Sequence, residues 1–132
     1  PIVDLVKQNI GEVMQQSELR SWIEHRAEML WVCLKCLVLM IVGIAVAISW
    51  GSFSDNAEFA LSIMVAVVGL FLWFGSHGAI MDIAAMRADM DEGLASTAFG
   101  TNFNKAPFSV YLILNALAML GSTVMLIIVI NA

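Results

Sequence analysis

Three long runs of apolar residues follow one another along the chain, at 29–50, 59–81 and 107–130. The middle run, Phe59–Met81, carries no charged side chain over 23 positions. Because an α-helix rises about 1.5 Å per residue, a helix over this run would be about 35 Å long. The hydrocarbon core of a bilayer is about 30 Å thick, so one such helix can cross it. The pattern therefore predicts three transmembrane helices.

The polar stretches around the middle run indicate where its helix begins and ends. Gly51–Glu58 is a short polar turn, in which Asp55 and Glu58 have the spacing of a capping box. This spacing places the start of the second helix near Asn56. At the other end the helical pattern continues into Asp82–Glu92. We expect one helix that is apolar in the bilayer and charged beyond it.

The connection before the last apolar run is polar and rich in turn-forming residues, and we expect it to be a loop. Pro107 follows and suits the first turn of a helix, where its missing N–H group costs nothing. The loop residues that carry this prediction are Gly93, Ser96, Thr97, Gly100, Asn102 and Asn104.

The first 20 residues have the pattern of an amphipathic helix. Ile2, Val6, Ile10 and Val13 recur at steps of three and four residues, with polar side chains on much of the other side. Such a helix would lie in the headgroup region or pack against protein.

A second helix start is expected at Ser21, since Glu24 stands three residues later at the capping-box spacing. We therefore divide the chain into 1–26, an amphipathic cytoplasmic or interfacial segment, and 27–132, a three-helix transmembrane domain. The expected fold class is an all-α membrane protein. It has an N-terminal amphipathic helix and three transmembrane helices, the second of them extended into the cytoplasm.

Composition supports a membrane protein and limits the partners. The chain is 61% hydrophobic and 13% charged, with a mean hydropathy of +0.89, whereas soluble domains are about 45–50% apolar and about 25% charged. The net charge is −5 and no basic patch is present to neutralise phosphates. Nucleic-acid binding is therefore excluded from the expected functions.

The few basic residues predict a topology. Four of the six lie in the first 35 residues, and the other two lie in 82–105, whereas the turn at 51–58 has two acids and no Lys or Arg. The positive-inside rule then places the N-terminus and 82–105 in the cytoplasm. We expect a multi-pass protein of the bacterial inner membrane, with its C-terminus on the periplasmic side.

Two motifs could carry chemistry. Cys33-Leu-Lys-Cys36 is a C-x-x-C, but it lies within a predicted transmembrane helix and supplies only two ligands for a metal. Structural thiols are the favoured interpretation, and redox or metal roles are the alternative. His77 lies near the end of the second span, where it could bind a haem or chlorophyll-like ring or relay protons. Hydrogen-bonded structure is its simpler role.

Small residues four positions apart occur in all three spans, and this spacing lets helix backbones approach closely in lipid. Asn115 could also hydrogen-bond to a neighbouring helix. We expect these residues to pack helices within the subunit, between subunits, or both. The pairs are Gly43 with Ala47, Ser62 with Ala66, Gly75 with Ala79, and Ala118 with Ser122.

An acidic run follows the second span. It is either a solvated helix face or a docking surface for a basic partner. Its mostly negative side chains do not suit binding to anionic lipid. The chain shows no nucleophile–base pair, phosphate loop or metal triad, so no enzymatic activity is expected. The residues of this candidate docking surface are Asp82, Arg87, Asp89, Asp91 and Glu92.

The layout of residues 59–132, with an apolar span, Gly78-Ala-Ile-Met81, a charged turn and a second span, resembles conjugative pilins of type IV secretion systems. This resemblance implies a subunit of a helical polymer that contacts phospholipid. This chain has an additional span and an acidic loop where such pilins tend to be basic. Its layout around Asn104–Pro107 is also similar to small three-span bacteriocin immunity proteins.

The sequence thus favours a non-enzymatic, oligomerising subunit of a bacterial inner-membrane assembly, with a secretion or conjugation (pilus-type) apparatus as the leading case. One alternative is a small immunity protein that blocks a membrane toxin, and another is an accessory subunit of a respiratory or photosynthetic complex. The expected partners are membrane lipid and other membrane-protein subunits, in a homo- or hetero-oligomer. No cofactor or metal is expected, although phospholipid could bind.

Overall fold

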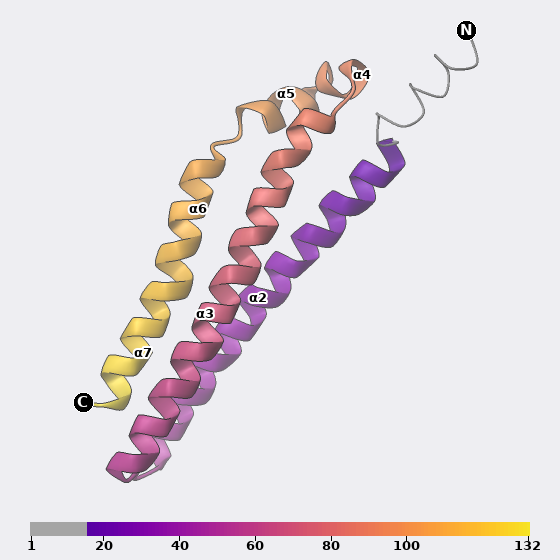
Figure 1. The fold of residues 1–132 in the computed structure, drawn as a ribbon. Coiled ribbons are helices and arrows are strands. Elements are labelled where there is room, and N and C mark those ends of the chain that lie inside the picture. The colour runs from indigo at the N-terminus through magenta and orange to yellow at the C-terminus, as the bar shows by residue number, and fades with distance from the viewer. Residues whose placement is uncertain (1–15) are drawn as a thin grey trace, which may run out of the picture.

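The computed structural model describes residues 16–132, which form three long helices and two short ones (Figure 1). The long helices are α2 (Gln16–Trp50), α3 (Asp55–Ala85) and a third made of α6 (Phe108–Ala116), a π-helical turn (Leu117–Gly121) and α7 (Ser122–Ile130). All three are long and apolar enough to cross a membrane. No strand occurs between residues 16 and 132. The all-α, three-span prediction is confirmed, whereas the amphipathic helix predicted for 1–20 lies mostly outside the described residues.

Helix α3 is the centre of the bundle, with α2 packed on one side and α6–α7 on another (Figure 1). The short 51–54 connection makes α2 and α3 antiparallel neighbours. Two apolar clusters draw on all three long helices. One contains Ile44, Val65, Leu126 and Ile130, and the other contains Leu37, Leu72 and Met119.

The start and end of α3 agree closely with the sequence pattern. Ser54 is its N-cap residue and the helix begins at Asp55, one position from the predicted start. Beyond Met81 it continues as α-helix to Ala85 and then as a 3₁₀ turn over Met86–Asp89. The helical run therefore extends into the acidic segment, but it ends before Glu92.

The start of α2 differs from the prediction. The helix already begins at Gln16 and runs unbroken through Ser21, so the predicted start at Ser21 is wrong. The helix shows no break between 26 and 27, where the sequence pattern placed the end of the amphipathic segment. Arg20 and Glu24, one turn apart on this helix, form an ion pair with 2.9 Å between Nε and Oε1. An ion pair between side chains four residues apart stabilises a helix, and Glu24 thus takes part in this pair within α2 and not in the expected capping box with Ser21.

The connection expected as a loop contains two short helices, α4 (Glu92–Ala95) and α5 (Ala98–Lys105). Each has a side-chain cap: Leu94 N–H donates to Asp91 Oδ1 at 2.6 Å, and Gly100 N–H donates to Thr97 Oγ1 at 3.1 Å. Thr97, which was predicted to lie in a loop, is therefore the N-cap of α5, and Asp91 of the acidic run is the N-cap of α4. Gly100 also lets α5 lie against α4, since a Cβ there would be 2.7 Å from the Cα of Ala95.

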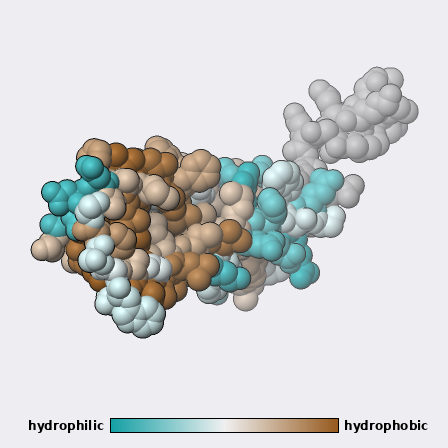
Figure 2. All heavy atoms as spheres, turned by 90° about the horizontal axis from the view of Figure 1, so that it is seen from below, coloured by the Kyte–Doolittle hydropathy of each residue, from teal (hydrophilic) through white to brown (hydrophobic). Residues whose placement is uncertain are grey.

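Apolar side chains cover much of the outer surface of the bundle. In Figure 2 brown apolar residues occupy the body of the molecule, and teal polar residues gather toward its ends. Large exposed side chains occur on every long helix, for example Leu39 on α2, Phe71 on α3 and Leu117 in the third. Such a surface is stable facing lipid chains, where no hydrophobic force drives the helices together.

Candidate functional site

The contact between α3 and α7 is closest at Gly69. A Cβ built on this glycine would lie 2.6 Å from Cγ2 and 2.8 Å from Cβ of Thr123, so no larger residue fits unless the helices separate. Thr123 is buried and its hydroxyl donates to the carbonyl oxygen of Met119 at 2.7 Å. Gly69 was not among the residues predicted to pack helices. A Gly with no small residue four positions away does not match the small-xxx-small pattern.

Several of the small residues expected to pack helices do so inside the subunit. Ser62 Oγ accepts a hydrogen bond from Asn131 Nδ2 at 2.8 Å, which joins α3 to the end of α7. A Cβ on Gly75 would lie 3.4 Å from Cys33 Sγ of α2, and Ala79 is almost completely buried. Ala66 and Ser122 are half-buried.

Two of the expected packing residues face outward instead. Gly43 on α2 is exposed, and a Cβ there would meet no atom within 4 Å. Ala118 in the π-helical turn is also exposed, while Ala47 is half-buried. The small residues of the described chain therefore fall into an inner set, packed around α3, and an outer set, Gly43 and Ala118, which is exposed.

Lys35 is the one charged residue of the first apolar run, and it is exposed on the outside of α2. It lies among Trp31, Leu34, Val38 and Leu39, which with it line a shallow apolar groove of about 420 Å³. Ionisable side chains within spans normally face the interior of the bundle or a water-filled cavity. Since side chains lean toward the N-terminus of their helix, the Lys35 ammonium can reach toward the end of the bundle where α2 begins.

Five buried side-chain nitrogen atoms find no hydrogen-bond partner among the described residues. Two belong to Arg26 and Arg87, and the other three are Trp73 Nε1, His77 Nδ1 and Asn115 Nδ2. The rings of Trp73 and His77 lie 5.5 Å apart, one turn apart on α3. The pairing of Gly69 with Thr123 fixes the antiparallel register, which brings Asn115 to the level of His77. The position of Asn115 is compatible with the predicted role between helices, but its side-chain amide bonds no residue of the described chain.

The two cysteines have different environments. Cys33 is half-buried between α2 and α3, Cys36 is exposed, and both are free thiols. Cys33 packs near Gly75 of α3, and the structural role of the two thiols stays a prediction. Across residues 16–132, no group of three or more His, Cys, Asp or Glu side chains could hold a metal ion.

The acidic run is partly engaged within the subunit. Asp82 Oδ2 lies 3.0 Å from Arg26 Nε of α2, although the N–H does not point along this line and the contact is ionic rather than a well-aligned hydrogen bond. Arg87 donates from Nη2 to the carbonyl oxygen of Ala106, and its guanidinium lies 4.3 Å from the centre of the Phe108 ring.

Of the other members of the run, Asp91 caps α4, and Asp89 and Glu92 are exposed. Of the candidate docking surface, Asp82 thus pairs with α2, Arg87 contacts the connection before α6, and Asp91 caps α4. Docking of a partner here stays a prediction, and the exposed carboxylates of Asp89 and Glu92 are the most accessible for it.

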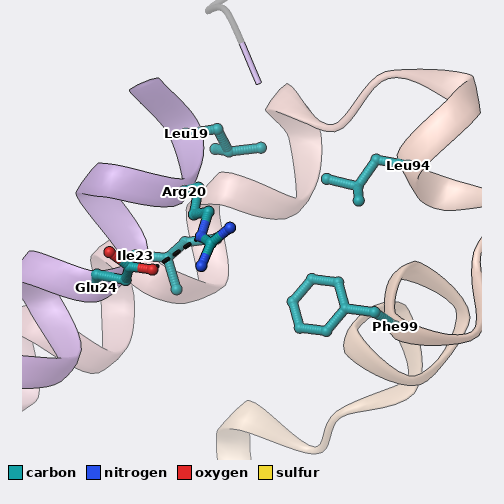
Figure 3. Close-up of a pocket in the computed structure, with 6 residues that line it drawn as sticks. All are labelled: Leu19, Arg20, Ile23, Glu24, Leu94 and Phe99. Atoms are coloured by element: carbon teal, nitrogen blue, oxygen red, sulfur yellow. Dashed lines mark hydrogen bonds and ion pairs between the residues drawn. The ribbon is translucent and has the colours of Figure 1, made fainter. Parts of the chain in front are cut away.

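A cavity of about 470 Å³ lies where α2 begins, between this helix and the α4–α5 segment (Figure 3). Leu19 and Ile23 from α2 and Leu94 and Phe99 from α4–α5 form its walls, and Arg20 with Glu24 lies at its edge. This cavity could not be predicted from the sequence, because the segment that forms one of its walls was expected to be a loop.

Comparisons with protein-family models, with curated proteins and with solved structures found no match to this chain.

Proposed function

We propose that this protein is a non-enzymatic subunit of a bacterial inner-membrane assembly, of the secretion or conjugation type, and that it binds its neighbours through the outer face of α2. One observation carries the proposal: Lys35 and Gly43 both lie exposed on α2 within a span, and neither has a partner among the described residues. A charge on the lipid-facing side of a span is costly, and such residues commonly mark function.

The open glycine supplies the geometry for a helix contact. Without a Cβ at Gly43, a second helix can approach the backbone of α2 as closely as α7 approaches Gly69. Ala47 lies one turn further along α2 and is half-buried, and its small side chain leaves room for a second helix beside Gly43. Packing of this kind gains van der Waals contact, which drives helix association in lipid.

Lys35 adds information about the partner. A buried ammonium needs an anionic group, and the runs 29–50, 59–81 and 107–130 contain no Asp or Glu. A second copy of this chain therefore offers no carboxylate within its spans. If Lys35 contributes to association through an ion pair, the opposing acid belongs to a different protein, and the assembly is a hetero-oligomer.

The proposed orientation places the end of the bundle that carries α4 and α5 in the cytoplasm. Arg26 in the first part of α2 and Arg87 in the turn after α3 are both half-buried and belong to this end, whereas the 51–54 connection joins the opposite ends of α2 and α3. A reporter enzyme fused after Ala132 that is active only in the periplasm tests this orientation. Activity in the cytosol would overturn it.

The decisive experiment is the mass of the native particle, purified from its own membrane in a mild detergent. We expect a particle larger than the 14.4 kDa monomer. Gly43→Leu should convert it to the monomer. Gly78→Leu is the matched control, because a Cβ on Gly78 also meets no atom within 4 Å but lies on α3. A particle that is monomeric in the unsubstituted protein, or that is unchanged in Gly43→Leu, would overturn the proposal.

The same preparation distinguishes the alternative functions. A complex of one copy with one toxin molecule would identify an immunity protein. A visible absorption band that disappears in His77→Ala would identify an accessory subunit of a respiratory or photosynthetic complex. Loss of association in Lys35→Gln would show that the partner is a different protein.

A further inference from the structure

We propose that α5 (Ala98–Lys105) is an interfacial helix, whose aromatic side lies in the headgroup region of the bilayer that the three long helices cross. The partner of this helix is the phospholipid surface itself. The inference is independent of the proposed function, because it concerns the end of the bundle and not the outer face of α2. It holds whichever side of the membrane this end occupies.

A row of four aromatic rings connects α5 to the first turn of α6. The Phe99 and Phe103 rings stack, with 5.6 Å between their centres and 12° between their planes. Phe103 meets Phe108 edge-on at 5.6 Å, and Phe108 meets Tyr111 in the same way at 5.7 Å. The aromatic side of α5 is therefore the side that contacts the third long helix. In Figure 1 α5 lies at the end of the bundle where α6 begins.

The start of the third long helix fixes the depth of this row. The helical run Phe108–Ile130 has 23 residues, which corresponds to about 35 Å. Its two ends therefore lie close to the two surfaces of a hydrocarbon core that is about 30 Å thick. From Phe108 the row continues in two steps of 5.6 Å to Phe103 and Phe99. Since the headgroup layer on each side is roughly 5–8 Å thick, α5 is held at the level of the headgroups.

The two sides of α5 suit a boundary between an apolar and a polar layer. Phe99 and Phe103 are one turn apart and share one side of the helix. The side chain of Phe99 is 54% exposed, although it also forms part of the cavity wall beside α2 (Figure 3). An interfacial helix buries such a side in the boundary between headgroups and acyl chains and keeps its polar side in water. The exposed polar side consists of Thr101, Asn102, Asn104 and Lys105.

The charges of the connecting segment are divided as a phospholipid surface requires. Residues 93–107 contain Lys105 and no Asp or Glu, whereas the exposed carboxylates of Asp89 and Glu92 precede this stretch. The Arg87 guanidinium lies over the aromatic row, 4.3 Å from the centre of the Phe108 ring. Cations near the surface of an anionic bilayer are attracted to it. Lys105 and Arg87 therefore complement lipid phosphates, although the acidic run as a whole does not.

The aromatic row is continuous with an exposed apolar surface on α6. Tyr111 is exposed, and so are Val110 and Leu114 in the first turns of this helix. In a bilayer these side chains meet lipid, since the helix that carries them is long and apolar enough to cross it. The row thus runs from the lipid-exposed side of α6 to Phe99 on α5. Lipid is the nearest apolar medium for the exposed Phe99 ring.

Spin-label accessibility of the full chain in vesicles of phosphatidylethanolamine and phosphatidylglycerol tests this placement. The background protein carries Cys33→Ala and Cys36→Ala, and each sample carries one nitroxide on α5. Collisions with oxygen, which dissolves in lipid, and with a water-soluble nickel chelate are measured. The ratio of oxygen to nickel collisions should be at least about threefold higher on the aromatic side, since an interfacial helix has one buried and one wet side. The labelled variants are Phe99→Cys and Phe103→Cys on the aromatic side, and Thr101→Cys and Asn104→Cys on the polar side.

Two further labels serve as references. Leu39→Cys on the outside of α2 reports lipid, and Asp89→Cys at an exposed carboxylate reports water. Equal ratios at the four positions of α5 would place this helix wholly in water or wholly in the bilayer and would overturn the proposal. Low collision rates with both reagents at 99 and 103 would also overturn it, because protein and not lipid would then cover the aromatic side.

A second comparison tests the exposed ring. With the label kept at Phe103→Cys, adding Phe99→Asp should raise its nickel collision rate about threefold, because a carboxylate draws this side of α5 into water. Asn102→Asp adds the same charge on the polar side and should leave the rate unchanged. An unchanged circular dichroism spectrum shows that the long helices remain folded in both variants. If Phe99→Asp leaves the label protected, or if both substitutions raise the rate equally, Phe99 does not lie in the headgroup layer and the proposal is wrong.

Discussion

Two glycines in apolar stretches of the bundle have opposite environments. Gly69 on α3 lies against Thr123, and a Cβ there would be 2.8 Å from the Cβ of that residue. Gly43 on α2 is exposed, and a Cβ there would meet nothing within 4 Å. Each glycine weakens its helix by about 1 kcal/mol relative to Ala. At Gly69 close packing inside the subunit offsets this cost, but no residue between 16 and 132 does so at Gly43.

The comparison shows what a small residue can mean in a membrane helix. Lipid provides no hydrophobic force between helices, so a narrow surface stabilises only where another helix approaches it. The inner surface around Gly69 has that second helix in α7. The outer surface around Gly43 gains stability only from a partner, and this difference is the physical basis of the proposed function.

The largest expected effect is that of Gly69→Leu. The added side chain has no space beside Thr123, so α3 and α7 must separate and the apolar cluster of Val65 and Leu126 must open. We expect a loss of about 3 kcal/mol in the free energy of unfolding, at the upper end of the usual cost of overpacking. Unfolding by a denaturing detergent in mixed micelles, followed by circular dichroism, measures it.

A double-mutant cycle sharpens this prediction. Gly69→Ala alone should destabilise, and Thr123→Ala in the same protein should recover part of the loss, because it removes the Cγ2 and hydroxyl groups that the new Cβ meets. Additive effects of the two changes would show that the helices do not touch at this point.

Two basic residues of α2, Arg26 and Lys35, differ in the same way, because Arg26 is engaged inside the subunit and Lys35 is exposed. Arg26 is half-buried, pairs with Asp82 and lies 5.8 Å from the centre of the Trp22 ring. Asp82→Asn should destabilise the bundle by about 1 kcal/mol, since both side chains are partly exposed and solvent screens the pair. Asp89→Asn, at an exposed carboxylate, is the control and should change stability little. The exchange Arg26→Asp with Asp82→Arg should restore stability. Failure of the exchange would mean that Arg26 acts through Trp22 instead.

A still smaller effect is expected at the far end of the inner surface. Asn131 Nδ2 donates to Ser62 Oγ at 2.8 Å and also to the carbonyl oxygen of Ile127 at 2.7 Å. Ser62→Ala should cost about 0.6 kcal/mol, the mean for hydrogen bonds between membrane helices. Thermal unfolding of Ser62→Ala beside Ser54→Ala, a residue whose side chain caps no helix N–H, measures the difference. Equal melting temperatures for both variants would remove this contact from the inner surface.

The number and type of the long helices could be predicted from the sequence, because each span is a continuous apolar run of the length that a bilayer requires. The start of α3 was predicted to within one position, but the N-cap residue is Ser54, whose side chain makes no capping hydrogen bond, and not Asp55. The prediction failed at α4 and α5. Thr97 was interpreted as a turn residue and Asp91 as part of the acidic run, although both cap helices. Helix caps and turns use the same residue types, so the sequence pattern alone does not separate a loop from two short capped helices. The close contact of Gly100 with Ala95, which packs α5 against α4, is visible only in the structure.

The inner and outer surfaces could not be distinguished from the sequence. The small-xxx-small pattern selected Gly43 and Gly75 together, yet only Gly75 approaches another helix of the subunit. All faces of a lipid-exposed helix are apolar, so hydrophobic periodicity, which orients helices of soluble proteins, carries no information about which side is inside. The side of α3 that faces the other helices also decides the partners of Asp82 and Arg87. The sequence does not reveal this side, so the acidic run was interpreted as one surface.

The smallest expected effect on stability is that of Gly43→Leu. The new side chain has open space around it, improves the local helix propensity and extends into lipid, so the free energy of unfolding of the monomer should change by less than about 0.5 kcal/mol. The same substitution made at Gly69 should cost several times more. If Gly43→Leu also removes the larger native particle, the loss cannot result from misfolding, and the outer face of α2 is a binding surface. If it destabilises the isolated monomer as Gly69→Leu does, Gly43 belongs to the inner packing and the contrast between the two surfaces is wrong.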